Sequence, residues 1–151
     1  MQKTVVFLTT MTSVLAVACA SGGPKPDYAT VPPEEIRQAL LDAGLPESMI
    51  VEYDEAPVLQ NYEEVSRASR HLYPPEAAQR GETGRIQTLV RVGLDGSVSD
   101  IRIGIPSGYP ALNDAAVTVA LRMRFSPAMR DDRPIVAWIP MWVQFGIVYA
   151  P

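Results

Sequence analysis

The residue types that most often do chemistry are scarce in this chain. Its 151 residues include one histidine, His71, and one cysteine, Cys19, too few for a site built from several such metal ligands. The sequence has no glycine-rich phosphate loop and no nucleophile elbow. Three of its four pairs of adjacent acids fall in predicted first helical turns or in a turn, where the helix dipole or turn hydrogen bonds account for them: Glu34-Glu35, Glu63-Glu64 and Asp131-Asp132. We therefore expect a protein that is not an enzyme and that holds no cofactor or metal.

Residues suited to binding lie near the end of the chain. After Asp131-Asp132 the sequence alternates with period two, as in a strand. Pro140 has no amide hydrogen to donate, which favours an edge position. Trp138 and Trp142 then share one sheet face beside an open edge, and large aromatic side chains are frequent binding anchors. One face of this strand carries Ile139, Met141, Val143, Phe145 and Ile147. The other face carries Val136, Trp138, Trp142 and Gln144.

Four elements must position that strand. Gly84 begins a half-buried strand, Asp95-Gly96 is a hairpin turn signal, and the return strand is out of phase near Ser99, which indicates a bulge. Pro110 begins an amphipathic helix with apolar residues at helical spacing as far as Met123. If the last strand runs opposite to the first, the strand order is 2-1-3, with the last strand at an edge.

The preceding segment is expected to be largely helical. Pro33 begins a helix that Gly44 ends, and Asn61 can cap a helix that Pro74 ends. A short helical segment then stops at Gly81, whereas residues 49–53 suggest a short strand. We expect three parts: a leader at 1–19, an acidic arm at 20–60 and the C-terminal domain at 61–149.

The leader is typical of an export signal, with Lys3 followed by an uncharged, largely apolar run. Ala16-Val17-Ala18-Cys19 resembles the lipobox of bacterial lipoproteins, which predicts a lipidated Cys19 that anchors the protein to a membrane. The alternative is that Ala18 and Ala20 form the small-x-small site of ordinary signal peptidase. Cys19 would then leave with the leader, and a mature chain starting at Ser21 would be a soluble periplasmic protein. Both readings place the protein in the envelope of a Gram-negative-type bacterium.

Charge divides the chain into two unequal parts. Residues 20–66 hold ten acidic and two basic residues, net −8, whereas residues 67–151 hold ten arginines and seven acids, net +3. The arginines are spread along the chain without a cluster, which argues against nucleic acid as a partner. An acidic arm that folds back over the basic domain and regulates it is one hypothesis from this asymmetry.

An ordered set of short motifs resembles the TonB C-terminal domain family over about half of the chain. The resemblance implies an α+β fold, a two-layer ββαβ domain whose three-stranded antiparallel sheet carries a helix on one face. The motifs are Tyr73-Pro74-Pro75-Glu76-Ala77, Gly84, Asp95-Gly96-Ser97-Val98, Ser107-Gly108, Leu112, Ala115-Ala116, Phe125-Ser126-Pro127-Ala128 and Phe145.

The same resemblance implies a partner and a way of binding it. Proteins of this family capture the TonB box, an extended segment of outer-membrane transporters, by adding it to the sheet. We predict such capture at the 136–144 edge, with both tryptophans as anchors: Val136, Trp138, Pro140, Trp142 and Gln144. Alternatively, the acidic arm or its helices simply cover the tryptophans.

Other partners stay open at this stage. The scaffold could bind peptidoglycan or another periplasmic protein without energy transduction, and the edge strand could pair two copies of the chain. Cleavage of the leader would remove the membrane helix through which the family draws energy. We therefore expect a peptide-capturing domain without that connection.

Overall fold

The computed structural model describes residues 32–146. Cys19, the predicted leader and Ile147 lie outside these residues. No helix in the described part of the chain is long and apolar enough to cross a membrane. The elements, in chain order, are α1 (Pro33–Asp42), the 3-10 turn η2 (Glu47–Met49), α2 (Tyr62–His71), α3 (Pro75–Gln79), β1 (Gly84–Val92), β2 (Val98–Ile105), α4 (Pro110–Ala120), β3 (Ala128–Arg130), β4 (Arg133–Ile135) and β5 (Ala137–Phe145).

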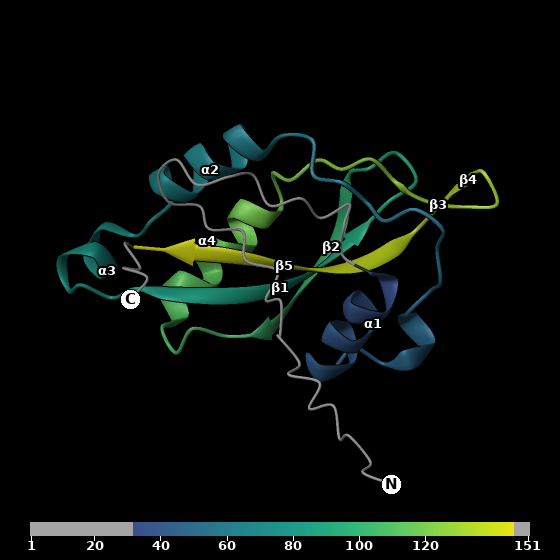
Figure 1. Ribbon diagram of the computed structural model, residues 1–151. Coiled ribbons are helices and arrows are strands. Elements are labelled where there is room, and N and C mark those ends of the chain that lie inside the picture. The colour runs from purple at the N-terminus through teal and green to yellow at the C-terminus, as the bar shows by residue number, and fades with distance from the viewer. Residues whose placement is uncertain (1–31, 147–151) are drawn as a thin grey trace, which may run out of the picture.

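An antiparallel sheet in the order β2-β1-β5 forms the centre of the fold (Figure 1). This confirms the predicted α+β class and the 2-1-3 strand order. The β1–β2 register shifts at Ser99, where the bulge was predicted, and again at Gly104. Gly96 in the connecting turn has a φ of 79°, and a Cβ there would lie 1.7 Å from the carbonyl oxygen of Phe125. Only glycine fits that position.

Helix α4 packs on one face of the sheet. Its buried residues are apolar and mostly small, so the helix lies close to the strands. Leu112 lies on the side to which a Cβ at Gly84 would point, 3.6 Å away, which places α4 on the face of the even-numbered β1 residues. Figure 1 shows α4 crossing the sheet behind β1 and β5. The helix itself ends at Ala120, and Met123 is buried beyond its end.

Helix α1 packs on the opposite face, a position that the sequence did not predict. A Cβ at Gly104 would lie 2.8 Å from Ala43, next to α1, and 3.2 Å from Leu89 on β1. Ile36 and Leu40 of α1 belong to the same cluster of buried apolar side chains as Trp138 of β5. Consequently β1 is buried on both faces from residue 86 to 90, and the prediction of a half-buried strand was wrong there.

Helix α2 lies beside α4 and β5 (Figure 1). Asn61 is its N-cap residue, as predicted, but makes no side-chain capping bond within the helix. Its Oδ1 accepts from the backbone N–H of Arg124, and its Nδ2 donates to the carbonyl of Arg122 and to Glu64. Asn61 therefore ties the start of α2 to the chain that leaves α4.

A short hairpin, β3–β4, precedes the last strand. Asp131 and Asp132 have φ values of 50° and 58°, the left-handed pair of a two-residue type I′ turn. The suggested strand at 49–53 is absent, because that segment holds the end of η2 and irregular chain. An isolated bridge from Glu55 to Met129 follows it. The predicted edge also began one residue early, since Val136 lies between β4 and β5.

Candidate functional site

Strand β5 has a neighbour on one side only among the described residues. The carbonyl of Met141 points toward β1, because it accepts a hydrogen bond from Thr88 Oγ1 at 3.0 Å. Residues of a strand alternate in the direction of their main-chain groups. The even-numbered residues of β5 therefore direct their N–H and C=O groups away from β1.

Those outward groups belong to four of the predicted site residues, Trp138, Pro140, Trp142 and Gln144. Pro140 offers a carbonyl but no donor, which an edge strand tolerates. The carbonyl of Gln144 is already engaged, since Ser69 Oγ of α2 donates to it at 3.1 Å. Helix α2 thus occupies the last outward position of β5, and the positions from 138 to 142 precede it.

The side chains of these residues lie on the sheet face that α1 partly covers. Trp138 is only 6% exposed, whereas Trp142 is half-buried. Each indole carries an arginine from another strand: Arg102 of β2 lies 5.2 Å from the Trp138 ring centroid, and Arg85 of β1 lies 4.8 Å from that of Trp142. The face beside the edge is therefore aromatic and cationic.

On β2, the other edge strand of the sheet, one outward-facing N–H group already has a partner. Ile101 lies opposite Val90, whose main-chain groups face β5, so the N–H of Ile101 points outward. That N–H donates to the carboxylate of the preceding residue, Asp100, at 2.8 Å. Three residues beyond Ile101, Gly104 lies at the second irregularity of the β1–β2 register.

The motif residues mostly hold the fold together. Tyr73 stacks on Phe145 at 5.9 Å between ring centroids and donates its hydroxyl to the carbonyl of Glu82 at 2.7 Å. The N–H of Phe125 donates to the carbonyl of Gly96 at 2.9 Å. Asp95 accepts two bonds from Ser97, which lower the pKa of its carboxyl group. The buried helix residues among them are Leu112, Ala115 and Ala116.

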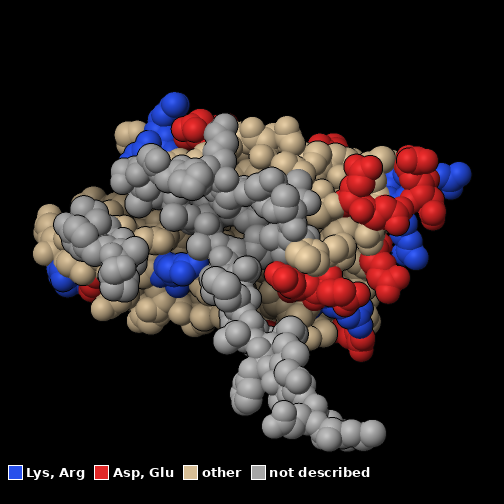
Figure 2. All heavy atoms as spheres, viewed as in Figure 1, with Lys and Arg blue, Asp and Glu red and all other residues tan. Residues whose placement is uncertain are grey.

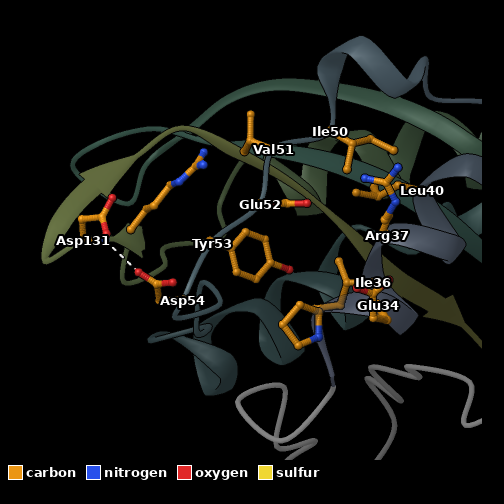
Figure 3. Close-up of a pocket in the computed structure, with 12 residues that line it drawn as sticks. Glu34, Ile36, Arg37, Leu40, Ile50, Val51, Glu52, Tyr53, Asp54 and Asp131 are labelled. Carbon is orange, nitrogen blue, oxygen red and sulfur yellow. Dashed lines mark hydrogen bonds between the residues drawn. The ribbon is translucent and has the colours of Figure 1, made fainter.

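A hollow lies between α1, residues 50–54 and the β3–β4 hairpin (Figure 3). Its volume is about 550 Å³. Figure 2 shows acidic side chains gathered on this side of the molecule, and Asp54 accepts from the backbone N–H of Asp131 at 2.7 Å. Burial of Tyr53 at its wall raises the pKa of that hydroxyl to about 12. Other acids lining the hollow are Glu34 and Glu52.

Residues 32–146 contain no side-chain cluster suited to binding a metal ion. No group of three or more His, Cys, Asp or Glu side chains there could hold a metal ion. His71 is exposed at the last residue of α2.

Sequence reasoning missed two contributors to the β5 region. Ser69 closes part of the edge, and Arg85 stacks on Trp142. Both contacts join residues more than 50 positions apart, so no local pattern reveals them.

Comparisons with known proteins agree with this arrangement. The family described as Gram-negative bacterial TonB protein C-terminal matches residues 69–147. Protein tonB2 of Pseudomonas aeruginosa is 37% identical over 75 residues, which is 50% of this chain and 28% of that protein. The chain therefore spans less than a third of the length of this relative. Because the matched family covers just over half of the chain and the sheet has the expected order, the chain belongs to the TonB C-terminal domain family.

Proposed function

We propose that this protein captures an extended segment of an outer-membrane transporter by adding it as a fourth strand beside β5. One observation carries the proposal: β5 is an edge strand whose even-numbered residues direct their main-chain groups away from β1. Main-chain hydrogen bonds would supply affinity, and the arginine-covered tryptophans would supply selectivity. The role is TonB-type transport in the envelope of a Gram-negative bacterium, with the domain facing the periplasm.

The pattern of outward groups sets the length of the segment. Trp138 and Trp142 each offer a donor and an acceptor, Pro140 offers an acceptor, and Gln144 offers a donor beside its engaged carbonyl. A bound segment that reaches all of these groups, from 138 to 144, therefore needs about seven residues, since paired strands match residue for residue.

The test is amide hydrogen exchange followed by NMR while a TonB-box peptide is added. Slower exchange is expected at the N–H groups of Trp138, Trp142 and Gln144. The N–H of Ile101 on β2 is the internal control, because Asp100 already accepts from it. No change on β5 at millimolar peptide, or protection on β2 instead, contradicts the proposal.

A peptide control needs no change in the protein. Methylating alternate backbone nitrogens of the peptide removes the donors that point to one side only. Methylation in one phase should abolish binding, and methylation in the other should leave it unchanged. Equal binding of both peptides would exclude strand addition.

A further inference from the structure

Arg85 holds an unusual position in the sheet. It lies on β1 opposite Gln144, and its guanidinium crosses to β5, where it lies 4.8 Å from the centre of the Trp142 ring. Stacking on an indole fixes the orientation of the planar guanidinium. The charge is thus held in place close to the β5 edge.

The guanidinium lacks partners. Its Nε and Nη2 atoms are buried and make no hydrogen bond, and no ion pair among residues 32–146 includes Arg85. By contrast, Arg91 on the same face of the same strand donates to Ser99 at 3.2 Å. Buried charged donors without acceptors cost free energy, which an incoming acceptor would recover.

The chemistry of the vacant donors selects the acceptor. Guanidinium presents its N–H groups in a rigid fork that matches the two oxygens of a carboxylate. The neighbouring side chains on that face, Gln144 and Trp142, carry no negative charge that could serve. Arg85 is half-buried as a residue, and because its Nε and Nη2 atoms are buried, the side chain must shift to present these two donors to a ligand.

A strand added to β5 brings a carboxylate within reach. Such a strand would lie two strand spacings from β1, about 10 Å. Arg85 already crosses the first spacing to reach the Trp142 ring. A Glu or Asp side chain of the added strand, opposite Trp142 and on the same face, would span the second strand spacing, between that strand and β5.

We infer that Arg85 and Trp142 form a carboxylate subsite that selects extended partner segments carrying an acidic side chain opposite Trp142. The inference rests on the proposed function, of which it names a specificity determinant. Arg102 over Trp138 is a parallel pair four residues along β5, but Arg102 is exposed. Solvation and salt weaken the attraction of such a charge, so it discriminates less.

The test walks a single glutamate through a neutral strand-forming peptide and compares each peptide with its glutamine counterpart. Glutamate should tighten binding at one position on one face, by about tenfold, the gain expected for charge-assisted hydrogen bonds. The Nε–H proton signal of Arg85 should move downfield with that peptide only. Arg85→Gln should remove the preference, Arg85→Lys should keep part of it, and Arg91→Gln should leave it intact.

The outcomes separate this inference from the proposed function. Peptides that protect the β5 amides but show no glutamate preference overturn the subsite and leave strand addition standing. A glutamate preference with an Arg85 shift but no β5 protection supports the subsite and overturns strand addition. The wild-type peptide series decides the matter even if Arg85→Gln fails to fold, because it needs no variant.

Discussion

The hydroxyl of Ser69 donates a hydrogen bond to the main-chain carbonyl of Gln144, 75 residues further along the chain. Both residues are buried, so this carbonyl has no access to bulk water. The bond joins a helix side chain to an outward-facing group of β5. It therefore contributes to stability and also occupies a position that an added strand would use.

Replacing Ser69 by alanine should lower the free energy of unfolding by about 1–3 kcal/mol, because the buried carbonyl loses its donor. Chemical denaturation measures this. Ser66→Ala is the matched control in the same helix: its hydroxyl accepts from Arg70, an exposed side chain that can turn to water. The control should cost about 0.5 kcal/mol or less, and equal losses would contradict the assignment.

The contact between Gly104 and Ala43 predicts an energetic coupling between the arm and the sheet. Gly104→Ala would place a Cβ 2.8 Å from that of Ala43 and should cost roughly 1–3 kcal/mol through overpacking. Ala43→Gly removes the obstructing methyl group, so the double variant should recover much of the loss. A double-mutant cycle in urea measures the coupling, and strictly additive effects would argue against this contact.

The turn at Asp95 predicts a measurable change in pH dependence. The side-chain and backbone hydrogen bonds from Ser97 lower the pKa of Asp95. Ser97→Ala should move that pKa up toward its ordinary value, which NMR titration of the carboxyl group detects. A lowered folded-state pKa gives stability that is present above the unfolded pKa and lost as pH falls through the folded one. The stability difference between wild type and variant should therefore shrink in acid.

Tyr53 predicts a substitution without a penalty. Its hydroxyl is buried without a hydrogen-bond partner, so Tyr53→Phe should leave the free energy of unfolding unchanged or raise it. Burial raises the pKa of the hydroxyl to about 12. Since this pKa is raised, its contribution to stability is complete below the unfolded tyrosine pKa and is lost as pH rises toward 12. Ultraviolet titration should show one late phenolate that the variant lacks.

Much of the fold was predictable because its signals are local. Period-two alternation, the Asp95-Gly96 turn, the phase break at Ser99 and the apolar stripe beginning at Pro110 each act within a few residues. The structure confirms the sheet order and the bulge that these signals predict. The missing donor of Pro140 indicated an edge strand, and β5 is one.

The unpredicted features depend on contacts between distant segments. The apolar stripe of α1 predicts that the helix packs against another element but does not say which one. Gly104, where the sheet comes close to the end of α1, looks like an ordinary strand residue in the sequence. Asn61 has the composition of a cap, yet its side chain bonds to the chain after α4. The orphaned donors of Arg85 emerge only when β1, β5 and Trp142 are placed together.

The N–H of Ile101 donates to the Asp100 carboxylate, so the β2 edge of the sheet has fewer free backbone donors to offer than it otherwise would. A sheet with two unprotected edge strands can pair edge to edge with further copies of itself without limit, which is a route to aggregation. Here a carboxylate and a bulge discourage pairing at β2, which leaves β5 as the more receptive edge of the described sheet. Unlimited joining of copies through both edges is therefore disfavoured, even though β5 has an unpaired side among the described residues.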